Sequence, residues 1–223
     1  MTSNLNDFES HIMGRNYRLL FGPMAGAILA LGIAGLALMI PGYNHVHQTV
    51  SEIGEIGSPA RFPFAIMLCC VAASILVFAS AVHDVSVAAH DSRLAAYLIG
   101  FMALPAAGIG VFAYPHPLHN VFGLSELIGY QAPLALALTW RRDPTAKSLT
   151  SFSWILYALI CIAIALNLSS LDRQGLVWPY VKPIYGLVQR ALFAAWFGWC
   201  AAVGLFLFQR KPCELSEVGL TKR

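Results

Sequence analysis

The stretch LLFGPMAGAILALGIAGLALMI, residues 19–40, decides the class of the fold, because 22 consecutive positions carry no charged side chain. A helix rises 1.5 Å per residue, so about 20 apolar residues cross the roughly 30 Å of hydrocarbon in a bilayer. A secretory signal has an apolar region of only about 7–15 residues, followed by a small-residue cleavage site. Residues 41–43 read Pro-Gly-Tyr instead, which favours a retained membrane span.

Five more apolar runs follow, at 62–83, 94–113, 120–140, 151–171 and 184–208. The chain is 58% hydrophobic and only 11% charged, whereas soluble domains carry about 25% charged residues. In lipid, a helix is the element that satisfies its backbone hydrogen bonds within one segment. The sequence therefore predicts an all-α, polytopic bundle of about six transmembrane helices over residues 19–208. We expect a cytoplasmic N-terminal segment at 1–18 and a cytoplasmic tail at 209–223.

Basic residues are distributed unevenly between the segments that join these runs. With the N-terminus inside, ten of the 14 Lys and Arg residues fall in inner segments and three in outer ones, while Arg190 lies within the sixth run. The inner ten are Arg15, Arg18, Arg93, Arg141, Arg142, Lys147, Arg210, Lys211, Lys222 and Arg223, and the outer three are Arg61, Arg173 and Lys182. The positive-inside rule therefore predicts a multi-pass protein of the inner (cytoplasmic) cell membrane with both termini in the cytoplasm. The net charge of +3 is too weak to indicate a nucleic-acid partner.

Small residues recur every four positions in two of the runs. They are Gly22, Gly26, Ala30 and Ala34 in the first run, and Ala194, Gly198 and Ala202 in the sixth. Such stripes let helix backbones approach closely in lipid. Packing within the bundle is the main interpretation, and a homodimer interface is the alternative.

The first outer loop contains a helix-start pattern. Thr49-x-x-Glu52 fits a capping box, in which two polar side chains satisfy backbone N–H groups at the start of a helix,. Val50, Ile53 and Ile56 would form the apolar side of this short helix. We expect the helix to lie at the outer membrane interface or to fold back over the bundle, covering the start of the fourth transmembrane helix.

Histidines gather in the outer loops, where four of the seven are found: His45, His47, His116 and His119. Three imidazoles and a water molecule form a common catalytic zinc site. Zinc is thus a possible cofactor, with Glu52 or Glu126 as the general base acting on a metal-bound water. The alternative is that these histidines order the loops through hydrogen bonds.

Two charged residues fall inside apolar runs at similar depth. Glu126 lies about six residues into the fourth run, and Arg190 lies at a comparable depth in the sixth. A charge in lipid is costly unless it is paired, so we expect the two to contact each other. One interpretation is a salt bridge that fixes helix register. The other is a ligand-binding cavity in the outer half of the membrane, lined also by Gln189, Asn167, Ser125 and Tyr185.

Two motifs resemble those of a known membrane family. Tyr43 followed by Ser51-Glu52-Ile53-Gly54 resembles a tyrosine followed by Ser-Glu-Leu-Gly after the first helix, in the family numbered 998 among the domains of unknown function. The segment 110–119, with Phe112, Pro115 and His119, is similar to that family's Gly-x-Phe-Pro…His segment, although Ala113-Tyr114 interrupts the Phe-Pro step. The resemblance covers about residues 19–208. It implies a six-helix fold and a special role for Ser51, Glu52 and His119, and it implies no activity.

Three functions are consistent with these patterns. The first is binding or sensing of a lipid or small amphiphile in a polar cavity of the outer leaflet. The second is a metal-assisted intramembrane hydrolase that uses the outer histidines. The third is a small transporter in which Glu126 and Arg190 form a gating pair.

Overall fold

The computed structural model describes residues 16–210, and every regular element in that part of the chain is helical. Six segments within it are long and apolar enough to span a membrane. They are Tyr17–Ala37, Arg61–Ala88, Leu94–Val111, Pro117–Thr139, Pro144–Leu171 and Trp178–Gln209. The prediction of a six-helix transmembrane bundle is confirmed. The expected cytoplasmic segments at 1–18 and 209–223 lie mostly outside the described residues.

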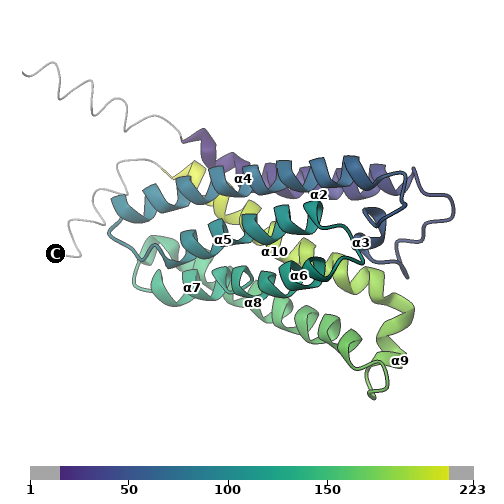
Figure 1. Cartoon of the computed structure of the whole chain (residues 1–223). Helices are drawn as coiled ribbons and strands as arrows, with labels where there is room; N and C mark the ends of the chain where they lie inside the picture. The colour runs from purple at the N-terminus through teal and green to yellow at the C-terminus, as the bar shows by residue number, and fades with distance from the viewer. Residues whose placement is uncertain (1–15, 211–223) are drawn as a thin grey trace, which may run out of the picture.

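Most spans are built from more than one helical element (Figure 1). In chain order these are η1 (Tyr17–Leu20), α2 (Phe21–Ala37), α3 (Val50–Ile53), α4 (Arg61–Ala88), α5 (Leu94–Val111), α6 (Pro117–Gly129), α7 (Ala132–Thr139), η2 (Pro144–Ala146), α8 (Lys147–Leu168), η3 (Ser169–Leu171), α9 (Trp178–Val181), η4 (Lys182–Ile184) and α10 (Tyr185–Gln209). The six predicted runs overlap these spans, which are longer in three places: α4 continues to Ala88 rather than ending near residue 83, and the fifth and sixth spans begin at Pro144 and Trp178 rather than near 151 and 184.

The bundle has two distinct ends. Tyr17 and Phe208 lie at one of them, with their ring centroids 5.6 Å apart, and we call this the terminal end. There Arg210 pairs with the buried Asp143 across 3.2 Å. The opposite end carries α3, α9 and the connections around them (Figure 1), and we call it the loop end. Because the number of spans is even, the start of the first span and the end of the last span both lie at the terminal end.

The fourth span is broken into α6 and α7 by a proline. Pro133 lies in the first turn of α7, and a proline inside a helix offers no N–H to the carbonyl four residues earlier,. That carbonyl belongs to Gly129, the last residue of α6. The buried indole N–H of Trp196 donates to it across 3.2 Å. A side chain of α10 therefore satisfies the backbone group that the break leaves open.

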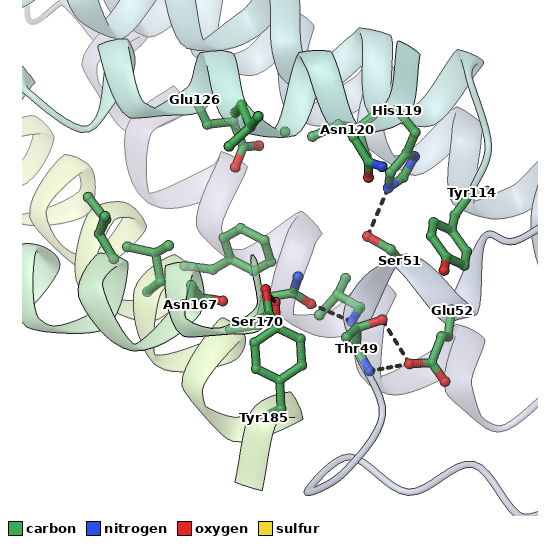
Figure 2. Close-up of a pocket in the computed structure, with 18 of the residues that line it drawn as sticks. Thr49, Ser51, Glu52, Tyr114, His119, Asn120, Glu126, Asn167, Ser170 and Tyr185 are labelled. Atoms are coloured by element: carbon green, nitrogen blue, oxygen red, sulfur yellow. Dashed lines mark hydrogen bonds between the residues drawn. The ribbon is translucent and has the colours of Figure 1, made fainter. Parts of the chain in front are cut away.

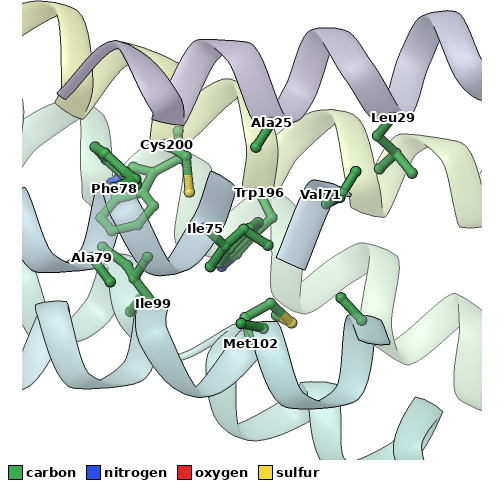
Figure 3. Packing of buried hydrophobic residues seen from close by; sticks show 14 of the residues in the cluster. Ala25, Leu29, Val71, Ile75, Phe78, Ala79, Ile99, Met102, Trp196 and Cys200 are labelled. Carbon is green, nitrogen blue, oxygen red and sulfur yellow. The ribbon is translucent and has the colours of Figure 1, made fainter. Parts of the chain in front are cut away.

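The core lies between α2, α4, α5 and α10 (Figure 3). Trp196, Trp199 and Phe78 of α4 are all fully buried. Helix α2 approaches α10 closely at Gly22, where an added Cβ would lie 2.7 Å from the Cys200 carbonyl oxygen. Gly22 and Gly26, the first half of the stripe on the first run, thus pack against α10, whereas Ala30 and Ala34 are exposed. The sixth-run stripe has no such contact at Gly198, because an added Cβ there would meet no atom of the described residues within 4 Å.

Candidate functional site

A cavity of about 1280 Å³ opens in the loop half of the bundle. It lies between α6 on one side and α8 and α10 on the other, with α3 across its loop end (Figure 2). Helix α6 packs mainly on α5, while α8 packs on α7 and α10. The two walls therefore belong to different helix groups, and the cavity is the space between them. Small-molecule pockets are commonly about 300–1,000 Å³, so this one is large.

The lining of the cavity changes from polar to apolar with depth. Near the loop end it includes Ser51, Glu52, His119, Asn120, Arg173 and Lys182. Asn167, Gln189 and Glu126 follow along the walls. The part that reaches the core is formed by Leu68, Val71, Met102, Phe193 and Trp196. Such a lining accommodates a molecule with one polar end and one apolar end.

Helix α3 forms the roof of the cavity at the loop end. Its capping box is present as predicted, because the Glu52 carboxylate accepts from both the Thr49 backbone N–H and the Thr49 hydroxyl at 2.9 Å. Val50 and Ile53 are buried. The Val50 backbone N–H donates to the Gln189 side chain across 2.6 Å. Of the two placements expected for this helix, it therefore takes the one folded back over the bundle.

The roof is joined to the wall of the cavity by a serine–histidine contact. The Ser51 hydroxyl oxygen lies 3.0 Å from Nε2 of His119, two residues into α6. Nδ1 of His119 lies 2.8 Å from the Phe112 carbonyl oxygen. A carbonyl only accepts, so Nδ1 carries the proton and Nε2 of the neutral ring accepts from Ser51. The predicted cover over the start of the fourth helix is confirmed by this contact (Figure 2).

Arg190 has a different partner set from the one predicted. Its guanidinium donates to the Tyr43 hydroxyl at 2.7 Å, the Gln48 carbonyl at 2.9 Å and the Gly186 carbonyl at 2.8 Å. All of these oxygens belong to the first loop or to α10 itself. Burial raises the pKa of Tyr43 above its ordinary value, although Arg190 lowers it, so Tyr43 stays a neutral phenol. It therefore accepts from Arg190 and donates to the Thr49 carbonyl at 2.6 Å.

Glu126 points into the cavity rather than toward Arg190 (Figure 2). Its carboxyl group accepts from the Tyr130 hydroxyl, one turn along, at 3.0 Å. No ion pair joins it to a basic residue within residues 16–210. The predicted contact between Glu126 and Arg190 is thus wrong. Equal depth in the membrane did not bring them together, because α10 turns Arg190 toward the first loop.

The four outer histidines are not gathered into one site. His47 bonds through Nδ1 to the Pro183 carbonyl, and His116 accepts from the Leu118 backbone N–H at 3.2 Å. His45 packs edge-on against the Tyr43 ring, and burial, with Arg190 nearby, lowers the pKa of His45. In the described part of the chain no group of three His, Cys, Asp or Glu side chains has metal-binding geometry. The described residues therefore do not bring the predicted zinc ligands together, and His45, His47 and His116 make contacts within or between the loops.

The remaining predicted site residues are divided between the cavity and its surroundings. Asn167, Tyr185 and Gln189 line the cavity, as do Ser51, Glu52 and Glu126. Ser125 instead donates to the Phe122 carbonyl at 2.7 Å. Sequence reasoning missed Asn120 and Tyr130, which also line it. The available signal was the spacing of Tyr130, which lies one turn from Glu126 on the same helical face; Asn120, six residues before Glu126, carried no such signal.

The fold and the site together define a six-span α-helical membrane protein with a polar-to-apolar cavity in one half of its bundle. A family model described as Protein of unknown function (DUF998) matches residues 23–206, so the chain belongs to this family and the resemblance is confirmed. Neither the curated proteins nor the solved structures gave a match to the chain.

Proposed function

We propose that this protein binds a lipid or small amphiphile from the bilayer in the cavity between α6 and α8. The observation that carries the proposal is the graded lining, with Glu126, Asn167 and Gln189 along the walls and Met102 and Trp196 in the core. The polar group of the ligand would bond to the first set, and its hydrocarbon part would bury against the second. Each buried CH₂ contributes about 0.8 kcal/mol, so a chain of several carbons supplies substantial affinity.

Charges at the rim suit a polar headgroup. Arg173 and Lys182 line the cavity on the side of α9, while Glu52 and Glu55 line it on the side of α3. Glu126 adds a carboxyl group deeper in the cavity, where an ionisable side chain within the membrane is a functional-site candidate by default,. A ligand that offers a hydroxyl or amine to Glu126 would satisfy a group whose protein partner is Tyr130 alone among the described residues.

The orientation is part of the proposal. We place the terminal end in the cytoplasm and the loop end outside the inner (cytoplasmic) membrane, because the basic residues concentrate at the terminal end,. The cavity then lies in the outer half of the bilayer. The gating-pair function loses its basis, because Arg190 is held by the first loop and Glu126 is not its partner.

The test fills the cavity without disturbing the bundle. A side chain added at Gly123 begins in open space on the cavity wall, so Gly123→Phe should block the binding site. Gly198→Phe is the matched control, because Gly198 also faces open space but lies outside the cavity. Lipids that remain bound after detergent purification are extracted and quantified by mass spectrometry. We expect the wild type and Gly198→Phe to retain one class of amphiphile. The amount bound to Gly123→Phe should be lower by about tenfold or more.

Equal lipid content in folded Gly123→Phe and wild-type protein would refute the proposal. Glu126→Gln separates the polar contribution, because it keeps the side-chain volume and removes the charge. We expect Glu126→Gln to change which headgroups are retained while leaving the cavity able to hold a chain.

A further inference from the structure

Ser51 and His119 have the relative geometry of a nucleophile and its general base. The Ser51 oxygen lies 3.0 Å from Nε2 of His119, within the range of about 2.6–3.2 Å seen between a nucleophile and its base,. His119 is only 5% exposed, and its other nitrogen is fixed by the Phe112 carbonyl. This carbonyl selects the tautomer in which Nε2 can take a proton from the serine, which is the role that a third group has in a catalytic triad.

Ser51 itself is held in place by the elements around it. The capping box between Thr49 and Glu52 fixes the backbone on either side of the serine. Gln189 of α10 accepts from the preceding backbone N–H, and the Ile56 N–H donates to the Tyr114 carbonyl at 2.8 Å. Positioning of this kind is what makes a hydroxyl reactive, because little reorganisation is left for the reaction. Ser51 and His119 both line the cavity (Figure 2).

We propose that Ser51 is a nucleophile and His119 its general base, acting on an acyl ester of the amphiphile bound in the cavity. The inference rests on the proposed function, since the cavity must bring the ester to the serine. It differs from metal-assisted hydrolysis in using a side-chain oxygen as the attacking group.

The reaction is an acyl transfer in two halves. Ser51 Oγ bonds to the ester carbonyl carbon while its proton passes to Nε2 of His119. The carbon–oxygen bond to the alcohol part then breaks, and His119 returns the proton to the departing oxygen. In the second half, water bonds to the acyl carbon while His119 takes one of its protons; the bond between that carbon and Ser51 Oγ then breaks, and His119 returns the proton to Oγ. The products are a carboxylic acid and an alcohol, and water is the sole co-reactant.

A donor for the developing oxyanion lies beside the pair. Asn120 follows His119 in the chain and lines the same cavity. Figure 2 shows its side chain next to that of His119. None of the hydrogen bonds found among the described residues uses its side-chain amide, so the amide can donate to the ester carbonyl oxygen as negative charge develops there,.

The experiment uses a long-chain alkyl fluorophosphonate, which reacts covalently with activated serines. The full-length protein, purified in detergent, is incubated with the probe, and the adduct is located by peptide mass spectrometry. We expect one adduct, on Ser51, and none in Ser51→Ala. His119→Gln should slow labelling by about 100-fold or more, because a positioned general base contributes about 10²–10⁴-fold. Ser169→Ala should label like the wild type, because Ser169 donates to the Leu166 carbonyl and lies outside the cavity lining.

Two further readouts make the result decisive. If His119→Gln folds poorly, the dependence on His119 is read from the wild type, whose labelling rate should rise with pH and level off as an imidazole loses its proton. Asn120→Ala should slow labelling without changing that profile. Folded wild-type protein that retains its amphiphile but gives no Ser51 adduct between pH 6 and 9 would overturn the inference and leave the proposed function standing. Failure of the Gly123→Phe experiment would instead remove the binding site itself.

Discussion

At the scale of single residues, the buried guanidinium of Arg190 shows how a charge is accommodated without a carboxylate. Its partners are two backbone carbonyls and the Tyr43 hydroxyl, and its Nε atom has no partner among the described residues. The loop that supplies Gln48 and Tyr43 is held to α10 by this cation. The sequence indicated that Arg190 required a partner. It did not indicate the partner, because the rotation of α10 depends on packing along its whole length.

Tyr43→Phe tests this arrangement directly. The substitution leaves Nη2 of the half-buried Arg190 without an acceptor among the described residues, and it leaves the Thr49 carbonyl with only the longer bond from the Glu52 N–H at 3.3 Å. An unsatisfied buried group costs about 1–3 kcal/mol, so thermal unfolding in detergent should shift clearly to lower temperature. Tyr180→Phe is the control, because the Tyr180 side chain is largely exposed at the same end. Equal unfolding temperatures for the two variants would contradict the role given to Tyr43.

At the scale of elements, the first loop and α10 approach each other so closely that only glycine fits. A Cβ added at Gly186 would lie 2.4 Å from the Gln48 carbonyl oxygen and 2.6 Å from that of His45. Both contacts are with backbone atoms, which cannot rotate away. The sequence predicted the loop and its capping box, but the importance of Gly186 depends on a contact between segments about 140 residues apart. No local pattern contains that information.

Gly186→Ala should therefore displace the roof of the cavity. Overpacking costs about 1–3 kcal/mol, and here it pushes the loop that carries Ser51 away from α10. Gly198→Ala on the same helix meets nothing within 4 Å and should be neutral or slightly stabilising, because alanine favours helix over glycine by up to about 1 kcal/mol,. Unfolding temperature and Ser51 labelling are measured for both variants. A Gly186→Ala protein as stable and as reactive as Gly198→Ala would show that the contact is unimportant.

The fourth span was predicted as one helix, although the structure divides it into α6 and α7. Apolar residues continue from α6 into α7, so hydropathy alone gives a single run. Pro133 marks the break in the sequence, yet prolines are tolerated within transmembrane helices when neighbours satisfy the freed backbone group. Trp196, 67 residues away, provides that hydrogen bond to Gly129. The break is thus resolved by a partner that local reasoning cannot identify.

At the scale of the whole molecule, the hydropathy and length of the apolar runs were enough to predict the fold class, without knowledge of tertiary contacts. Six apolar runs predicted six spans because the bilayer requires helices of about that length,. The cavity was predicted only as an outer-half pocket. Its position between α6 and α8 follows from how the helices divide into groups, α6 with α5 and α8 with α7 and α10. That division depends on side-chain fit. The small-residue stripes indicated the close packing only at Gly22 and Gly26 of α2, and not on α10.

At this scale we predict that the terminal end of the bundle faces the cytoplasm. In a variant without the native cysteines, Leu176→Cys places a thiol at the exposed loop end and Ser148→Cys places one at the exposed terminal end. A membrane-impermeant maleimide should label position 176 in intact cells, and it should label position 148 only after the cells are opened. The reverse pattern would overturn the assignment of the terminal end to the cytoplasm.

The roof over the cavity affects the route by which a ligand can enter, and therefore the fraction of protein molecules that hold one. Residues 43–56 are bonded to α10 through Arg190 and to the α6 side through His119 and Tyr114, so the loop end is tied on two sides. Under the proposed function, a ligand would enter from the bilayer between α6 and α8. A ligand that arrives by this route is drawn from the two-dimensional mixture of the leaflet, not from water. Occupancy then follows the ligand's mole fraction in the membrane, so even modest intrinsic affinity fills the site with an abundant lipid.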